Sequence, residues 1–285
     1  MPGTLYIVAT PIGNLEDITL RALRVLKDVD LIACEDTRQT RKLLTRYEIR
    51  TPTISYHQHN ERQRSRQLMS KLKEGTSIAL VTDAGAPTIS DPGLVLIQAA
   101  IAEQIPIVPI PGPSALTTAL MAAGVPTDRF LFVGFLPPRR ARRRRELMTL
   151  ASLPYTLVFF EAPHRIRATV EDMLEILGDR PAVLARELTK VHEEFRRARL
   201  SRLRRELEEQ SIRGELVLVV APPSDDSSKR PPVDRDALSE RISELMRSGN
   251  IDFTSAIKRV AEEYGMSKNE VYREIIKHKT ERREE

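Results

Sequence analysis

The sequence contains no tryptophan and a single cysteine, Cys34, among its 285 residues. One cysteine cannot form an internal disulfide, and it cannot supply the thiolate set of a cysteine-based zinc site. No stretch approaches the roughly 18 apolar residues that a membrane-spanning helix needs. The opening residues, MPGTLYIVAT, lack the basic segment of a signal peptide and run directly into a predicted strand. We therefore expect a globular cytoplasmic protein that uses no metal and no membrane.

Arginine is unevenly placed along the chain. Six of the residues at 139–145 are arginine, although the net charge of the whole chain is only +5. A solvated surface more often mixes both signs, so this run indicates an anionic polymer partner, most commonly nucleic acid. A solubilising helix face is the alternative. A second basic stretch, at 195–207, is interrupted by Glu206 and followed by Glu208 and Glu209. There we favour the solvated helix face.

Short apolar runs alternate with helical patterns along most of the chain, which predicts mostly parallel sheet with helices on its faces. The expected strands form two sets, 5–10, 30–35, 52–56, 78–83 and 106–111, then 130–137, 156–162, 182–187 and 215–222. Turn residues in AGVPTDR separate the two sets. The length suits this division, and we expect α/β domains at 1–123 and 124–222.

A polar, proline-rich segment follows the second set of strands. We expect residues 223–234 to form an extended linker and 235–285 to form a small helical domain. In that domain Gly265 ends one predicted helix, and Ser267 begins another with Glu270 three residues later. The pattern is that of a helix-turn-helix unit, although a plain helical hairpin for packing or dimerisation fits it equally well.

Four loops rich in small, proline or acidic residues follow strands of the first set. They are ATPIGN (9–14), CEDTR (34–38), TDAGAPTISDPG (82–93) and PIPGPSA (109–115). The loop at 82–93 has no lysine and neither of the glycine spacings of a phosphate loop. In open α/β sheets, ligands bind at the carboxyl ends of the strands. The loops therefore predict a pocket where backbone and small side chains approach a ligand closely.

Eight ordered motifs carry a resemblance to a known family. They are ATPIGNLEDIT, ACEDTRQTRKLL, SYHQHNE, DAGAPTISDPG, PGPSA, GFLPPR, FFEAPHRI and RELTKVHEE, within residues 4–221. In these motifs the chain closely resembles the small-subunit ribosomal RNA methyltransferase I family, of the tetrapyrrole-methylase fold group. The resemblance implies two α/β domains of the class III methyltransferase type, with S-adenosyl-L-methionine in the cleft between them. It also implies a homodimer that methylates the 2′-hydroxyl of a cytidine ribose in 16S rRNA, near the decoding centre of the 30S subunit.

The resemblance also implies which residues contact the cofactor. Carried onto this sequence, they are Ile12, Gly85, Ala86, Pro87, Ile89, Ser114, Ala115, Phe160 and Leu216. The chain departs from the wider group at one point, because it reads GAP at 85–87 where that group has GDP. An acidic contact is lost there, and whether Asp83 replaces it stays open.

A ribose hydroxyl is a poor nucleophile at neutral pH, so a base that takes its proton or a cation that stabilises the alkoxide should lie nearby. The candidates are Glu35, Asp83, Glu187 and Lys190. Glu35 follows a strand of the buried type, so an acid there calls for a functional reason, whereas Asp36 could simply cap the next helix. Glu187 and Lys190 are three apart and could equally form an ordinary ion pair.

We expect RNA phosphates to be contacted by basic side chains, with strongly salt-dependent binding. The candidates are Arg38, Arg139, Arg140, Arg142, Arg143, Arg144, Arg145 and Arg165. His57 and His59, even with Glu61, make a weak metal set, and we expect contacts to RNA or a second subunit, or helix capping, there instead.

Two other functions compete with this interpretation. A tetrapyrrole methyltransferase of the same fold has a substrate with few carboxylates, which gives no reason for the arginine run at 139–145. A non-catalytic nucleic-acid-binding regulator built on the helical tail gives no reason for all four strand-end loops. Binding of S-adenosylmethionine separates the regulator from the two enzymes.

Overall fold

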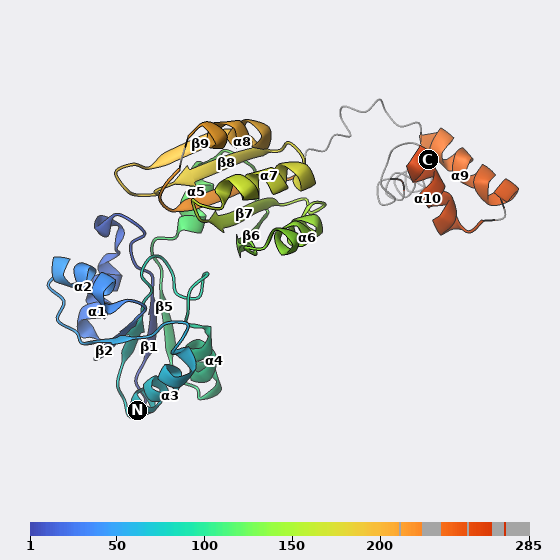
Figure 1. Ribbon diagram of the computed structural model, residues 1–285. Coiled ribbons are helices and arrows are strands. Elements are labelled where there is room, and N and C mark those ends of the chain that lie inside the picture. The colour runs from blue at the N-terminus through green and yellow to red at the C-terminus, as the bar shows by residue number, and fades with distance from the viewer. Residues whose placement is uncertain (211, 224–234, 250, 264–270, 272–285) are drawn as a thin grey trace. The chain divides into compact units, whose positions relative to one another are not determined.

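The computed structural model describes residues 1–210, 212–223, 235–249, 251–263 and 271 (Figure 1). The chain divides into two compact units, Met1–Ser224 and Asp225–Glu285. Unit 1 contains two five-stranded sheets with their helices, and we call these halves the first and the second lobe. Among the described residues, no helix has both the length and the apolar character needed to cross a membrane.

The first lobe is a parallel sheet with helices on both faces. Its elements are β1 (Leu5–Val8), a 3-10 helix (Leu15–Asp17), α1 (Leu20–Asp28), β2 (Leu31–Cys34), α2 (Thr37–Arg46), β3 (Thr53–Ser55), α3 (Glu61–Lys73), β4 (Ile78–Leu80), α4 (Leu94–Ala102) and β5 (Ile107–Ile110). The strand order is β3-β2-β4-β1-β5, and every pairing is parallel. This order brings the loops after β4, β1 and β5 side by side at one edge.

Two apolar clusters hold this sheet between its helices. Leu26 of α1 belongs to the cluster on one face, which also includes residues of α2. Leu68 of α3 belongs to the cluster on the other face, with residues of α4. Strand side chains alternate between the two faces, so the neighbours Ile78 and Ala79 join opposite clusters. The central strand β4 is buried throughout, as its continuous apolar sequence requires, whereas the edge strands β3 and β5 are only partly buried.

The second lobe is a mixed sheet. Its elements are α5 (Ala115–Ala123), β6 (Phe130–Phe135), α6 (Arg140–Leu150), β7 (Thr156–Glu161), α7 (Ile166–Leu177), β8 (Pro181–Arg186), β9 (Glu194–Arg199), α8 (Leu200–Glu209) and β10 (Leu216–Val220). The order is β6-β7-β10-β8-β9, with β6 and β7 parallel and the other pairs antiparallel. Helices α6, α7 and α8 pack on one face and α5 on the other. The carboxyl ends of β6, β7 and β8 therefore share an edge with the start of β10.

The α/β fold and all nine predicted strands are confirmed. Strand β9 is an addition, because residues 194–199 fall in the second basic stretch, where we expected a solvated helix face. That prediction is wrong for the first half of the stretch, which pairs with β8 and forms the sheet edge. There Arg197 donates to the carbonyl oxygen of Ala122, and Arg199 to that of Asp179. The second half is helical, as α8.

Unit 2 has a small apolar core of its own. Helices α9 (Arg235–Gly249) and α10 (Phe253–Glu263) contribute Leu238 and Ile257 to a cluster that also includes Val271. Arg241 of α9 pairs with Glu263 of α10 at 3.0 Å. The predicted linker, apart from its first residue, lies outside the described residues, as do the helix end and helix start predicted at 265 and 267.

Candidate active site

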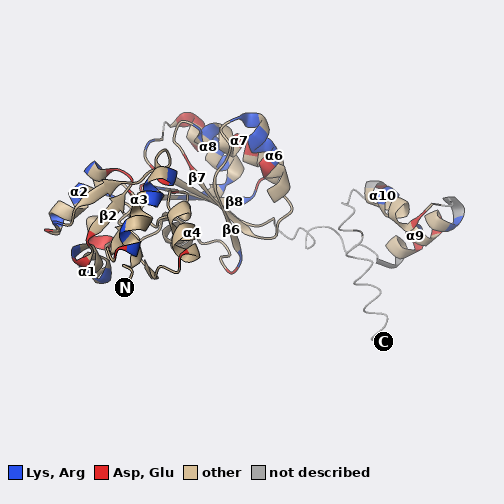
Figure 2. Ribbon diagram, turned by 90° about the horizontal axis from the view of Figure 1, so that it is seen from below, with Lys and Arg blue, Asp and Glu red and all other residues tan. Residues whose placement is uncertain are grey.

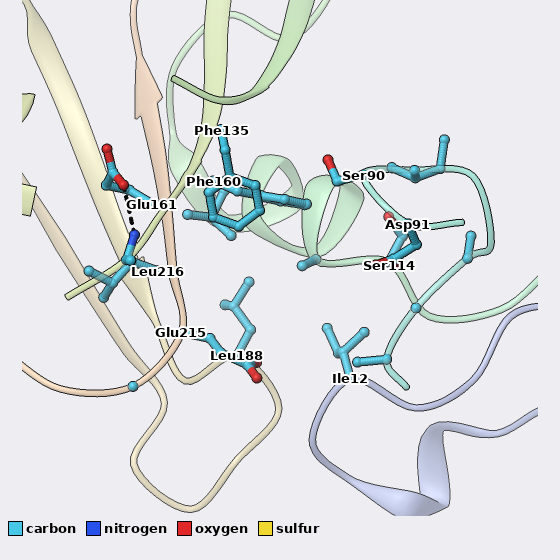
Figure 3. A pocket seen from close by; sticks show the side chains of 18 of the residues that line it. Ile12, Ser90, Asp91, Ser114, Phe135, Phe160, Glu161, Leu188, Glu215 and Leu216 are labelled. Carbon is cyan, nitrogen blue, oxygen red and sulfur yellow. Dashed lines mark hydrogen bonds between the residues drawn. The ribbon is translucent and has the colours of Figure 1, made fainter. Parts of the chain in front are cut away.

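A cavity of about 370 Å³ lies between the carboxyl edges of the two sheets (Figure 3). Its first-lobe wall comes from the loops after β1, β4 and β5, and consists of Ile12, Ala84, Gly85, Ala86, Ile89, Ser90, Asp91 and Ser114, continued by Ala115 at the start of α5. Its second-lobe wall comes from the ends of β6 and β7, the turn after β8 and the start of β10, and includes Phe135, Phe160, Glu161, Leu188, Glu215 and Leu216. Strand ends of both sheets thus converge on one space.

The cavity gathers nearly all of the predicted cofactor residues. Every one of them lines it except Pro87, which is buried in the loop after β4. The loop at 34–38, which we expected to share the same pocket, contributes no lining residue. That loop follows β2, which lies beyond β4 in the strand order and so farther from the second lobe's wall.

Backbone hydrogen bonds brace the first-lobe wall. Thr10 and Gly85 form an isolated bridge with N–O distances of 2.9 and 3.0 Å. The Thr10 hydroxyl donates to the carbonyl oxygen of Thr82 at 3.0 Å. Gly85 has a φ of +85°, a left-handed conformation that other residues rarely adopt. The loop after β4 is therefore tied to the loop after β1 and holds a fixed backbone surface toward the cavity.

The two lobes meet directly beside the cavity. The Asn14 N–H donates to Thr189 Oγ1 at 3.0 Å. A Cβ atom at Gly13 would lie 2.5 Å from Lys190 Cγ and 2.9 Å from the carbonyl oxygen of Leu188. Ile12 belongs to the same apolar cluster as Leu188. The turn after β8 therefore rests against the loop after β1, and the absence of a side chain at residue 13 allows this approach.

Three carboxylates lie near the ends of β2 and β4. Burial, and then the charge of Asp83, raises the pKa of Glu35. Burial, and then the charges of Glu35 and Asp83, raises the pKa of Asp91 to about 6. Asp83 accepts a hydrogen bond from the Asp36 N–H at 2.9 Å. Glu35 and Asp83 are therefore neighbours, as predicted from their strand ends. Of these three carboxylates, only that of Asp91 lines the cavity.

Glu187 and Lys190 form an ion pair within a turn, not within a helix. The Lys190 ammonium lies 2.9 Å from Glu187 and 3.1 Å from Glu215, which lines the cavity. A hydrogen bond from the Glu215 N–H, together with Lys190, lowers the pKa of Glu187. Partial burial alone would lower the pKa of Lys190, but its two carboxylate partners raise it. Glu187 is therefore a weak proton acceptor, and Lys190 is a stable cation at the cavity rim.

The arginine run on α6 divides into two groups. Arg143 is 4% exposed, and its guanidinium lies 2.6 Å from the Asp172 carboxylate on α7. Arg140 and Arg144 contact the same carboxylate at 3.1 and 3.0 Å. Burial alone would raise the pKa of Asp172, but these hydrogen bonds lower it. The prediction that Arg143 contacts RNA is wrong, because its guanidinium is buried between α6 and α7.

The second group is exposed. Arg139, Arg142 and Arg145 point away from the core and make no ion pair with any described residue. Figure 2 shows basic segments on α6 and its neighbouring helices, mixed with acidic ones, and further basic segments on the helices of the first lobe. These three arginines remain available to an anionic partner, whereas Arg140, although its side chain is 62% exposed, is already paired with Asp172.

The other two predicted RNA contacts differ from each other. The Arg38 side chain is 88% exposed and pairs with Asp36 at 2.7 Å. Asp36 also accepts from the Arg38 N–H, so its predicted role as the cap of α2 is confirmed. The Arg165 side chain is only 18% exposed and faces inward, 3.3 Å from Glu161 and bonded to the carbonyl oxygen of Leu136. Arg38 is open to a ligand, whereas Arg165 braces the end of β7.

His57 takes part in the local turn before α3. The Asn60 side chain accepts from the His57 N–H at 2.9 Å and makes no cap bond to α3. Glu61 accepts from the Gly93 N–H at 2.9 Å, which ties α3 to the loop after β4. His59 is exposed. No group of three potential metal ligands is found in the part of the chain that the structure describes.

Eleven lining residues were not predicted, among them Asp91, Phe135, Glu161 and Leu188. Asp91 belongs to a loop already singled out, and Phe135 and Glu161 are the last residues of their strands, so the strand-end rule was the available signal. Leu188 directly follows the predicted strand at 182–187, so the same signal applied, but its orientation toward the cavity had none. Its place depends on a turn in which Glu187 and Thr189 both have positive φ, at 50° and 65°.

The chain is similar to known proteins over most of its length. The family model for Tetrapyrrole (Corrin/Porphyrin) Methylases matches residues 4–204. Ribosomal RNA small subunit methyltransferase I of Micromonospora olivasterospora is 48% identical over 275 residues, which cover 96% of this chain and 86% of that protein. A protein of the same name from Thermotoga maritima is 47% identical over 219 residues, which cover 77% of this chain and 98% of that one.

A solved structure is similar in fold. It is uroporphyrin-III C-methyl transferase from Thermus thermophilus complexed with S-adenyl homocysteine. The TM-score is 0.54 at 20% identity, and the match covers 77% of this chain and 97% of that one. At this identity the likeness extends to the arrangement of the two lobes and no further.

Proposed function

The chain belongs to the tetrapyrrole (corrin/porphyrin) methylases, within the family of ribosomal RNA small subunit methyltransferase I, and on that basis we propose its reaction. It transfers a methyl group from S-adenosyl-L-methionine to the 2′-hydroxyl of a cytidine ribose in 16S rRNA, near the decoding centre. The observation that carries the proposal is the convergence of the family's cofactor positions on one cavity between the two sheets.

The residues present fit this cofactor. The cavity volume of about 370 Å³ falls within the range of sites for small molecules and cofactors. Its walls combine the apolar side chains of Ile12, Ile89 and Leu216 with the close backbone of Gly85. The bound cofactor would supply an activated methyl group. The wall residues would hold it folded, exclude water and orient it toward an incoming hydroxyl.

The charged residues near the cavity would have different roles in the methyl transfer. By pKa alone Glu35, whose pKa is raised, is a stronger proton acceptor than Glu187, although its loop does not line the cavity. Lys190 is suited to stabilise negative charge that develops on the same oxygen. Asp83 positions the backbone of Asp36 at the end of β2.

The substrate side follows from the exposed basic residues. Arg38, Arg139, Arg142 and Arg145 would contact RNA phosphates, which orients the substrate without reading its sequence. The resemblance to the family supports a homodimer that acts in the cytoplasm on 16S rRNA or the assembled 30S subunit. A tetrapyrrole substrate would leave these arginines without a role.

The test uses labelled S-adenosylmethionine and 30S subunits from cells that lack this activity. We expect one ribose-methylated cytidine in 16S rRNA, located by mapping the labelled nucleotide, and naked 16S rRNA tested in parallel identifies the substrate form. A Gly85→Val variant should lose the label, since a branched side chain is strained at a φ of +85° and faces the cavity. Wild-type protein that binds cofactor but leaves 16S rRNA unlabelled would contradict the proposal.

A further inference from the structure

Three acidic side chains line the cavity, and only one of them has no partner. Glu161 is 3% exposed and accepts a hydrogen bond from the Thr169 hydroxyl at 2.6 Å. Glu215 pairs with Lys190 at 3.1 Å, and its side chain is 71% exposed. Asp91 makes no hydrogen bond or ion pair with any residue that the structure describes. Among the acidic side chains of the cavity wall, it is therefore the one whose carboxylate has no polar partner among the described residues.

The surroundings of Asp91 disfavour a bare negative charge. The side chain is half-buried and lies with Ser90 and Ser114 on the first-lobe wall (Figure 3). The charges that act on it come from Glu35 and Asp83, and both are negative. Glu61 of α3 adds a third carboxylate to this loop, bonded to the Gly93 N–H. On the second-lobe wall the charged lining residues are again acidic, Glu161 and Glu215, and each is already paired with a cation, Arg165 and Lys190 respectively.

A carboxylate in such a place is stabilised either by a proton or by a cationic ligand. S-adenosylmethionine carries a sulfonium and an ammonium against one carboxylate, so its net charge is +1. We propose that Asp91 is the counter-ion for the positive charge of the cofactor, an inference that rests on the proposed function. The cation would relieve both the repulsion from Glu35 and Asp83 and the loss of hydration.

A pH dependence of binding follows. In the free protein the pKa of Asp91 is raised to about 6, so the carboxylate is mostly protonated at pH 5 and mostly charged at pH 7.5. A bound cation favours the charged form, so binding at pH 5 must first release a proton. We expect the affinity for S-adenosylmethionine to fall about tenfold from pH 7.5 to pH 5, the factor that one pH unit below the pKa implies.

The experiment measures cofactor affinity by calorimetry, without RNA, for the full-length wild-type protein and two variants. Asp91→Asn should weaken S-adenosylmethionine binding about tenfold or more at pH 7.5, as removal of a charge partner does. It should also abolish the difference between pH 5 and pH 7.5. Asp128→Asn is the matched control, because Asp128 is exposed in the loop before β6 and outside the cavity, and it should match the wild type.

A second ligand shows which positive group of the cofactor, the ammonium or the sulfonium, pairs with Asp91. S-adenosylhomocysteine retains the ammonium but has a neutral sulfur. If Asp91→Asn weakens both ligands, Asp91 partners the ammonium; if it weakens S-adenosylmethionine alone, it partners the sulfonium, and either result supports the proposal. Unchanged affinity in Asp91→Asn overturns it, and a loss of methyl transfer with unchanged affinity would make Asp91 a proton acceptor instead. Should the variant fail to fold, a wild-type affinity independent of pH overturns the proposal by itself.

The outcomes distinguish a failure of the counter-ion role of Asp91 from a failure of the proposed function. Wild-type protein that binds no S-adenosylmethionine at any pH would contradict the proposed function and the counter-ion role together. Wild-type binding with no effect of Asp91→Asn contradicts the counter-ion role alone.

Discussion

Arg142 and Arg143 are neighbours in one arginine run, yet they lie in opposite surroundings. Arg143 is buried against Asp172, whose side chain is 1% exposed, while Arg142 is exposed on α6. Removing one partner of a buried pair leaves the other charge without compensation, which costs more than the pair itself contributes. The two residues should therefore respond differently to the same substitution.

We predict that Arg143→Ala lowers the free energy of unfolding by about 3 kcal/mol, measured by urea denaturation followed by circular dichroism. Arg140 and Arg144 still contact Asp172 and should limit the loss. Arg142→Ala, the matched control, should change stability by less than about 0.5 kcal/mol. In RNA binding we expect the larger effect from Arg142→Ala, which should weaken the affinity for RNA and reduce its salt dependence. Equal stabilities of the two variants would show that the Asp172 contact contributes little.

The sequence could reveal the arginine run but not this division. Charge density depends on composition alone, whereas burial of Arg143 depends on Asp172, 29 residues away on another helix. The same limit applies to Asp91, because a loop at a strand end can be predicted while the partners of each of its side chains cannot. Residue roles that depend on local rules were predictable, as the capping of α2 by Asp36 illustrates.

At the scale of elements, the turn after β8 fixes one wall of the cavity. It contacts the loop after β1 through Thr189 and the backbone of Leu188, and Gly13 is the residue that permits the contact. An added methyl group there would lie 2.9 Å from the Leu188 carbonyl oxygen, and a backbone atom cannot move aside as a flexible side chain can. The turn would have to shift as a whole, taking Leu188 with it.

We predict that Gly13→Ala weakens S-adenosylmethionine binding about tenfold, since overpacking of this kind typically costs 1–3 kcal/mol. Calorimetry measures the change, and circular dichroism confirms that the fold is retained. Thr189→Ser keeps the hydroxyl that accepts from the Asn14 N–H, so it should bind like the wild type. Unchanged affinity in Gly13→Ala would mean that this contact does not define the cavity wall.

The predicted strands were recognisable by their apolar runs, which are buried throughout in the central strands β4 and β10. Strand β9 escaped prediction because its sequence, EFRRAR, is polar and lies at a sheet edge, where only one neighbour pairs with it. Its arginines donate to carbonyl oxygens of other elements, which only the folded chain brings near. Strand β5 shows the opposite case, since Pro109 is tolerated because β5 is also an edge strand and pairs with β1 alone.

At the scale of the whole molecule, the cavity belongs to unit 1. Every lining residue and every member of its four apolar clusters falls within Met1–Ser224. The core of unit 2 consists of residues from 238 onward. The Thermotoga maritima relative is matched over 219 residues that span 98% of its length, so it is close in length to unit 1 alone. Cofactor binding should therefore not require unit 2.

We predict that a protein ending at residue 224 folds and binds S-adenosylmethionine within about twofold of the full chain, a difference of roughly 0.4 kcal/mol. Calorimetry on the two proteins side by side measures this. Methyl transfer to 30S subunits should also persist, because the strand-end loops and the exposed arginines of α6 remain. If transfer falls while cofactor affinity holds, unit 2 contributes to substrate binding. Loss of cofactor binding in a folded truncated protein would contradict the assignment of a complete cofactor site to unit 1.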